Sequence, residues 1–322
     1  MFLMWPMLVV LGLGFFAIGT VVGSFLNVCI YRIPWQKSVI WPGSRCPHCY
    51  STIAARDNIP IVSWFALRGE CRSCGARISV RYPLVEALVG FLFLGAYLID
   101  VIAAPRGLWG DVSAFQLVVA VYHALFLALL VAAAFIDYDL MIIPDAIAVT
   151  GIVIGIALGT LWPQVRPEPG SATTHVQGFW IGLVGLVVGG VVILVVRQCT
   201  AVVLTVLRVL NLTELREGMG VGDLTLLGMI GAFMGWQAAV LTFFLAPFFG
   251  LGQAVWKLFN KIKKRIGGGQ LSSSDREMPF GPYLSMAAAT LLFLWPKLWG
   301  GWAKGLFHTF YVIFWWMLGI NV

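Results

Sequence analysis

Long apolar segments dominate this chain and constrain its fold more than any other feature. With 60% hydrophobic and 11% charged residues among 322, the chain is unlike a soluble domain. The apolar segments long enough to span a membrane are roughly 7–30, 83–103, 114–136, 142–162, 178–196, 224–256, 280–296 and 305–320. Since 224–256 can hold two short spans, we predict an all-α polytopic membrane protein with about eight or nine transmembrane helices.

The basic residues are distributed unevenly between the loops. They are concentrated in segments 32–81, 197–216 and 257–276. The opposite loops hold only Arg106, Arg166, Lys297 and Lys304. Because cytoplasmic loops are enriched in Lys and Arg, this bias places the N-terminus outside and the three basic segments inside.

The formal net charge of +7 follows from the same loop bias. Because the basic residues are spread over separate loops, we expect no nucleic-acid partner. Contact with anionic membrane lipids suits such loops better. The first apolar segment lacks a basic start, so we expect a retained span. No internal repeat is apparent in the sequence.

Two cysteine pairs lie in the first basic segment, as Cys46-Pro-His-Cys49 and Cys71-Arg-Ser-Cys74. Two such turns can present four thiolates to one tetrahedral Zn²⁺ ion. Disulfides are rare in the reducing cytoplasm, so the pairs favour metal binding. The matched spacing disfavours the alternatives, inert buried thiols or a redox pair. Four thiolates leave no open coordination position, so this zinc is expected to stabilise the loop and not to catalyse.

Acidic residues border the apolar segments in two places, where charge is costly and points to function. The two clusters comprise Asp137, Asp139 and Asp145, and Asp223 with the preceding Gly220 and Gly222. The expected topology places both clusters at the cytoplasmic membrane face. Two carboxylates held close together cannot both ionise easily, so one can activate a water while the other donates a proton.

A simpler interpretation of these acids is structural. Asp223 could open a helix as its N-cap, while Asp137 and Asp139 could be ordinary interfacial acids. Either motif alone favours this interpretation. The pairing of the two motifs, together with the upstream cysteines, favours catalysis. The glycines before Asp223 would let a backbone approach closely, either to pack helices or to admit an extended substrate.

In this combination of motifs, the chain resembles the type IV prepilin leader peptidases, which are membrane aspartyl enzymes with a GxGD signature. The resemblance covers roughly residues 20–290. Beyond the cysteine and aspartate motifs, it rests on Gly23-Ser24-Phe25-Leu26-Asn27-Val28, Asp57-Asn58-Ile59-Pro60, Arg81-Tyr82-Pro83-Leu84-Val85-Glu86 and Pro279-Phe280-Gly281-Pro282.

The resemblance implies an activity and a site. Asp137 and Asp223 would form the catalytic pair, with Asp139 as the alternative to Asp137. Enzymes of this family cut the basic leader from type IV prepilins and type II secretion pseudopilins, after a glycine at the cytoplasmic face of the bacterial inner membrane. Members that carry the cysteine loop usually also methylate the new N-terminus with S-adenosylmethionine.

The expected organisation has four parts. These are a first transmembrane helix (1–31), a cytoplasmic zinc-binding loop domain (32–82), a peptidase core (83–296) and an extra C-terminal segment that adds a span (297–322). The chain departs from the family pattern at Thr225, where the family usually has lysine.

Two other functions compete with peptidase activity. A non-catalytic zinc-stabilised membrane scaffold of a pilus or secretion system would explain the cysteines but not the paired aspartates. A proton-coupled transporter would place its acids nearer the bilayer midplane. The sequence indicates no clear S-adenosylmethionine site. Glu86 is a weak candidate, and a structural interfacial role suits it at least equally well.

Overall fold

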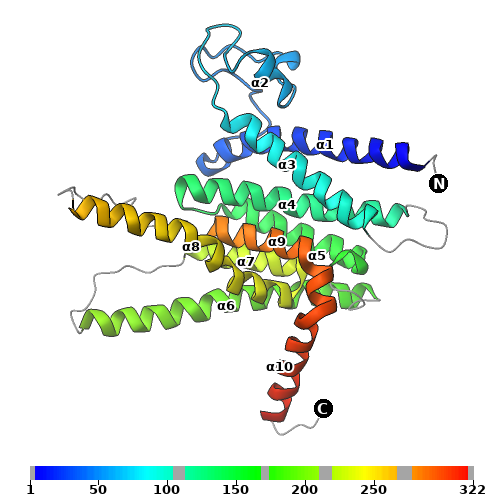
Figure 1. Cartoon of the computed structure of the whole chain (residues 1–322), viewed down its shortest axis with the longest axis vertical. Helices are drawn as coiled ribbons and strands as arrows, with labels where there is room; N and C mark the ends of the chain where they lie inside the picture. Colours follow the sequence, from blue (N-terminus) through cyan, green and yellow to red (C-terminus); the bar gives the residue numbers. More distant parts are fainter. Residues whose placement is uncertain (1–3, 104–112, 168–173, 210–219, 267–277, 318–322) are drawn as a thin grey trace. The chain divides into compact units, whose positions relative to one another are not determined.

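The chain folds into helices, as the computed structural model shows for residues 4–103, 113–167, 174–209, 220–266 and 278–317 (Figure 1). In these ranges there is no strand, and β pairing is limited to two isolated bridges, Arg45↔Thr52 and Glu70↔Arg77. The prediction of an all-α protein is therefore confirmed.

The long helices follow the apolar segments, because a helix pairs its own backbone groups where water is absent. The α-helices are α1 (Met4–Arg32), α2 (Val62–Ala66), α3 (Arg81–Tyr97), α4 (Ala114–Leu140), α5 (Asp145–Leu161), α6 (His175–Val209), α7 (Val221–Met234), α8 (Trp236–Ile266), α9 (Gly281–Leu298) and α10 (Lys304–Met317). The shorter helical turns are η1 (Ile33–Trp35), η2 (Ala55–Asp57), η3 (Leu98–Ile102), η4 (Pro163–Val165) and η6 (Trp299–Ala303).

In the described part of the chain, five helical segments are long and apolar enough to cross a membrane by length and composition: α1, α3 together with η3, α4, α6 and α8. The predicted segment 224–256 is divided between two helices, because Gly235 adopts a φ of 92° between α7 and α8. The total number of spans stays a prediction. In the C-terminal segment, α10 covers much of residues 305–320, whose role as an extra span stays a prediction, and residues 318–322 lie outside the described ranges.

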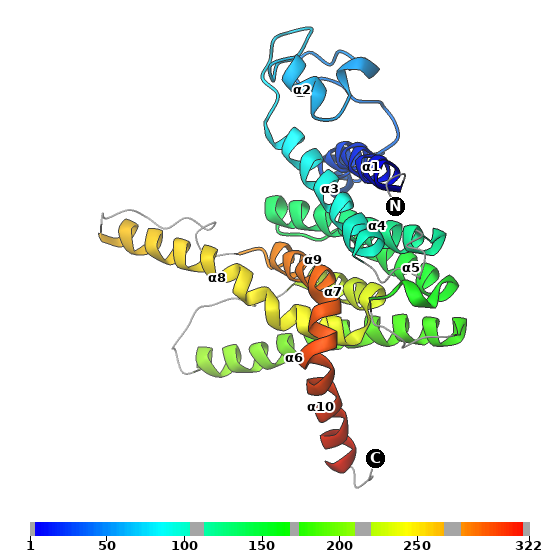
Figure 2. The same ribbon diagram turned by 45° about the vertical axis from the view of Figure 1, so that its right-hand side comes forward.

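The chain divides into two compact units, Met1–Ile147 and Ala148–Val322. The first contains α1 to α4 and the cysteine region, and the second contains α6 to α10 with most of α5. In the first unit, α1 packs mainly against α3, and both views show the two helices crossing (Figure 1, Figure 2). The two candidate aspartates are therefore divided between the units, Asp137 in the first and Asp223 in the second.

Small residues allow α1 and α3 to pack closely. A Cβ atom added at Gly19 would lie 2.8 Å from the Gly90 Cα, and one added at Gly23 would lie 2.7 Å from the Glu86 Cα. Any side chain at these glycines would push the backbones apart. Such small-residue crossings are common between membrane helices, where close van der Waals packing replaces the hydrophobic effect.

Helix α7 is largely enclosed within the second unit. All its residues from Leu226 to Met234 are buried, and it packs against α6, α8 and α9. It contacts α6 where a glycine of one helix faces a glycine of the other. A Cβ added at Gly185 would overlap the carbonyl oxygen of Gly231, and a Cβ added at Gly231 would overlap that of Gly185. The first turn of this enclosed helix carries Asp223. The position of that carboxylate in the second unit is therefore set by close packing.

A buried arginine joins three helices of the second unit. Arg166 follows η4, is 4% exposed, and donates to backbone carbonyls of α5, α6 and α7. Its Nη1 atom is 2.9 Å from the Gly159 oxygen and 2.6 Å from the Gly178 oxygen, and its Nη2 atom is 3.3 Å from the Ala232 oxygen. A Cβ at Gly159 or Gly182 would overlap the guanidinium. Arg166 thus links three helices through buried hydrogen bonds, and it is not a solvent-exposed loop residue.

We predict that Arg166→Met destabilises the protein by about 3 kcal/mol, because several buried carbonyls would lose their donor. The unfolding midpoint in detergent, followed by tryptophan fluorescence, measures the effect. Lys304→Met removes an exposed cation and serves as the control. Equal midpoints for the two variants would show that the carbonyls find other partners.

Candidate active site and metal centre

The four cysteines come together in the segment 33–80, called here the cysteine lobe, between α1 and α3. All four sulfur atoms lie within 4.8 Å of one another, and the Sγ atoms of Cys46 and Cys74 are 3.8 Å apart. Tetrahedral coordination with Zn–S bonds of about 2.3 Å places neighbouring sulfurs roughly 3.8 Å apart. The cluster of Cys46, Cys49, Cys71 and Cys74 therefore has the ligand set and spacing that suit Zn²⁺.

The two cysteine turns share one backbone pattern. In each, the amide of the first cysteine donates to the carbonyl five residues on, and its carbonyl accepts from the amide four residues on. These bonds are Cys46 N to Ser51 O and Tyr50 N to Cys46 O in the first turn, and Cys71 N to Ala76 O and Gly75 N to Cys71 O in the second. The lobe thus contains an internal repeat that the sequence analysis missed, because the turns share little besides their cysteines.

The repeat explains an unusual backbone conformation. Gly75 has a φ of 69°, which glycine adopts at little cost. The equivalent residue of the first turn is Tyr50, with a φ of 57°. A non-glycine residue is disfavoured in this left-handed region. The first turn keeps the conformation because the same hydrogen bonds close it.

The thiols of the cluster differ in acidity. The Ser51 hydroxyl, 3.0 Å from the Cys49 sulfur, lowers the pKa of Cys49 to about 6. The Ala76 amide lowers the pKa of Cys74, but desolvation and the neighbouring thiols outweigh it and raise the value to about 12. Four adjacent thiols cannot all ionise without a cation among them, whereas a metal ion favours thiolates.

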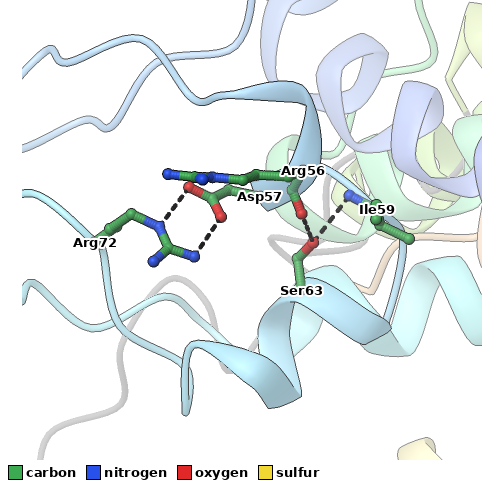
Figure 3. A network of polar contacts seen from close by, with 5 residues as sticks. All are labelled: Arg56, Asp57, Ile59, Ser63 and Arg72. Carbon is green, nitrogen blue, oxygen red and sulfur yellow. Dashed lines mark hydrogen bonds and ion pairs between the residues drawn. The ribbon is translucent and has the colours of Figure 1, made fainter.

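An ion pair and a hydroxyl organise the rest of the lobe (Figure 3). The Arg72 guanidinium donates two bonds to Asp57, of 2.8 and 2.7 Å, and holds the pKa of that carboxyl below its usual value. The Ser63 hydroxyl donates to the Arg56 carbonyl and accepts from the Ile59 amide. The Asp57-Asn58-Ile59-Pro60 stretch is therefore fixed between α2 and the second cysteine turn.

Glu86 connects the lobe to α3. Glu86 is 8% exposed, and its carboxylate accepts a 2.7 Å hydrogen bond from the Ile61 amide. Ile61 has a φ of 62°, which is strained for a β-branched residue. One turn earlier on α3, the Tyr82 carbonyl accepts from the Asn27 amide group of α1. Glu86 thus joins α3 to the lobe through this hydrogen bond. Whether its role is structural or functional stays a prediction.

Asp137 lies in the last turn of α4 and is 5% exposed. Its carbonyl accepts a 2.8 Å hydrogen bond from the amide of Met141, whose left-handed conformation ends the helix. Asp145 begins α5 and is exposed, at a helix N-terminus where a negative charge is favourable. Of these two acids on either side of the turn, only Asp137 is buried.

Asp139 is partly exposed and bound by Arg81. The guanidinium donates to both carboxylate oxygens, at 2.9 and 2.5 Å, in a bidentate pair. In a helix, residues two apart point about 200° away from each other, so Asp137 and Asp139 face opposite sides of α4. Arg81 and Asp139 are 58 positions apart, so no local sequence signal indicates this pair.

Asp223 is the third residue of α7 and is 7% exposed. Its carboxylate accepts a 3.0 Å hydrogen bond from the Gly220 amide, so it caps the helix from inside the first turn and not as the N-cap residue. The Thr225 hydroxyl, at the position of the expected lysine, donates to the Gly222 carbonyl. The approach of Asp137 to Asp223 stays a prediction, as do the catalytic roles of both residues.

Comparison with known proteins adds a family to these features. A model described as "Bacterial Peptidase A24 N-terminal domain" matches residues 17–99, and one described as "Type IV leader peptidase family" matches residues 124–255. The first match includes the cysteine lobe, and the second includes both candidate aspartates.

Similar curated proteins carry the name "Prepilin leader peptidase/N-methyltransferase". The Pseudomonas putida protein is 32% identical over 84% of this chain and 86% of its own length. The Aeromonas hydrophila protein is 31% identical over 88% of this chain and 89% of its own length. The Myxococcus xanthus protein is 39% identical over 69% of this chain, but the match spans only 56% of that longer relative. No solved structure matches. The chain therefore belongs to the type IV leader peptidase family.

Proposed function

We propose that this chain is an aspartyl peptidase that removes the basic leader of type IV prepilins and type II secretion pseudopilins. The observation that carries the proposal is the burial of two carboxylates at helix ends, Asp137 at 5% and Asp223 at 7% exposure. Buried acids in a membrane protein are costly and mark functional sites. Membership of the family and the names of its relatives support leader cleavage.

The reaction needs the two carboxylates in opposite protonation states. One takes a proton from water as the water attacks the scissile carbonyl, and the other gives its proton to the leaving amine. The exposed Gly220 beside Asp223 has no Cβ to obstruct an extended substrate backbone. Gly222 and the acids Asp139 and Asp145 would support the two catalytic turns.

The proposed location is the bacterial inner membrane, with the cysteine lobe and both aspartates on the cytoplasmic side. The basic loops support this sidedness. The expected partners are prepilins, pseudopilins and the surrounding lipids, without nucleic acid. In this scheme residues 32–82 form the zinc-binding domain and residues 83–296 the peptidase core, with 1–31 and 297–322 as flanking membrane segments.

The lobe would be held together by one Zn²⁺ ion bound to its four cysteines. The clustered sulfurs support this, and a lobe of this size has too few buried apolar residues for a stable core. Zinc would supply cross-linking between the two turns and no catalysis. A scaffold without catalysis would use the same zinc site, but gives no reason to bury Asp137 and Asp223.

Methylation of the new N-terminus is the second proposed activity, supported by the relatives' shared name. S-adenosylmethionine would supply the methyl group. The Glu86 carboxylate accepts a hydrogen bond from the Ile61 amide, which supports a structural role for it over a role in binding that cofactor. We therefore assign the activity without a binding site.

We expect Asp137→Asn and Asp223→Asn each to lower the rate of leader cleavage by roughly 10²–10⁴-fold, because each removes a proton-transfer group. Cleavage of a purified prepilin is followed by mass spectrometry. Glu70→Gln, in an exposed acid of the lobe, is the control. Retained cleavage in either aspartate variant would remove that residue from the catalytic pair.

Purified protein is expected to contain close to one equivalent of zinc, measured by elemental analysis. Replacing Cys46, Cys49, Cys71 and Cys74 together with serine should abolish the zinc, because a serine hydroxyl does not replace a thiolate ligand. Well-folded wild-type protein without zinc would contradict the site.

Single cysteine-to-serine changes are expected to reduce methylation or stability more than cleavage, because the lobe is distinct from the aspartate motifs. Incubation with prepilin and S-adenosylmethionine separates the activities, since leader loss and methyl gain give different mass changes. Equal loss of both activities in protein of unchanged stability would show that the lobe serves the two reactions equally.

A further inference from the structure

Arg81 contacts two residues on one face of α4. Its guanidinium binds both carboxylate oxygens of Asp139, and it lies over the ring of Phe135, 5.1 Å from the ring centre. Phe135 and Asp139 are four residues apart, so they lie one above the other on the helix surface. Arg81 therefore holds the last turn of α4 at two points.

Asp137 lies midway between these two residues in the sequence. At about 100° per residue, it points about 200° away from each of them, to the opposite side of the helix. The burial agrees with this geometry, because Asp137 is 5% exposed whereas the Asp139 side chain is 31% exposed. A contact that fixes the Phe135–Asp139 face also fixes the direction of Asp137.

The other end of this contact is itself held in place. Arg81 is the first residue of α3, directly after the cysteine lobe. The next residue, Tyr82, accepts from Asn27 of α1, and Glu86 holds Ile61 of the lobe. The Arg81 backbone is thus fixed by α1 and by the lobe, unlike that of an arginine on a mobile surface segment.

We propose that Arg81 is a positioning residue that sets the rotation of the last turn of α4, with Asp139 as its structural anchor. In this arrangement Asp137 stays directed into the protein, and Asp139 is excluded as an alternative catalytic acid. Arg81 is thus the residue at the start of α3 that contacts the last turn of α4. The inference rests on the proposed catalytic role of Asp137 and deepens it.

The first experiment measures leader cleavage in Arg81→Gln and Asp139→Asn. We expect each to lower kcat by about 10–100-fold with little change in KM, since small misplacement of a reacting group is costly. Arg81→Lys should recover only part of the loss, because lysine lacks the bidentate geometry. The reversed pair, Arg81→Asp with Asp139→Arg, should have a kcat at least tenfold higher than that of either reversed single variant.

The Asp57–Arg72 pair of the lobe is the matched control. It is also a bidentate arginine–aspartate pair, but both of its partners belong to the cysteine lobe and not to α4. Asp57→Asn and Arg72→Gln are expected to leave kcat for cleavage within about twofold of wild type, because both residues belong to the lobe and neither lies on the helix that carries Asp137. An unchanged kcat in Arg81→Gln, or a reversed pair no better than its single variants, would overturn the proposal.

A second experiment does not depend on activity. Asp137→Cys is treated with a water-soluble thiol reagent, and labelling of its peptide is measured by mass spectrometry. We expect slow labelling with Arg81 present and at least fivefold faster labelling with Arg81→Gln, at equal zinc content. Equal labelling would overturn the proposal even where cleavage falls. If Asp137→Asn is active but labelling responds to Arg81, the catalytic assignment fails while the positioning contact stands.

Discussion

Polar groups that leave water must find their partners within the protein, and this constraint governs both units. Helices satisfy it for the backbone, so the exceptions are side chains and helix ends. Arg166 meets it with carbonyls of three helices, Glu86 with the Ile61 amide, and Asp223 with the Gly220 amide. Each pairing joins a helix to a neighbouring segment or closes its first turn. The same pairs that satisfy buried polarity therefore position the proposed catalytic and zinc-binding segments.

The features that could be predicted from the sequence are local ones. Apolar runs indicate helices through composition alone, and two closely spaced cysteine pairs indicate a metal cluster because each pair lies on one turn. The sequence left Asp137 and Asp139 as alternatives, since they are two residues apart. Helical geometry and burial give the two acids different environments, because of the two only Asp137 faces the interior, and the catalytic role itself stays a prediction. The division of the segment 224–256 follows from the backbone of Gly235, and sequence analysis allowed for it.

The features that escaped prediction depend on residues far apart in the chain. Arg81 is separated from Asp139 by 58 positions and Arg166 from Ala232 by 66. When basic residues are only counted per loop, both arginines indicate membrane topology. Such a count carries no information about the residues that each arginine contacts. A usable signal did exist for Arg166, since Gly155, Gly159, Gly178 and Gly182 are spaced one helical turn apart in two pairs. Such glycine pairs leave room for a large side chain as well as for a helix.

The coordination of Arg166 has a consequence for biogenesis. Its acceptors on α5 precede it in the chain, but Ala232 emerges from the ribosome 66 residues later. The guanidinium is thus fully paired only after α7 has been made and has entered the unit. Until then the guanidinium lacks its Ala232 acceptor, and a buried charge that lacks a hydrogen-bond partner is costly. Assembly of this unit is therefore coupled to the arrival of α7, the helix that carries Asp223. The proposed catalytic turn and the Arg166 contacts that hold its helix form at the same stage.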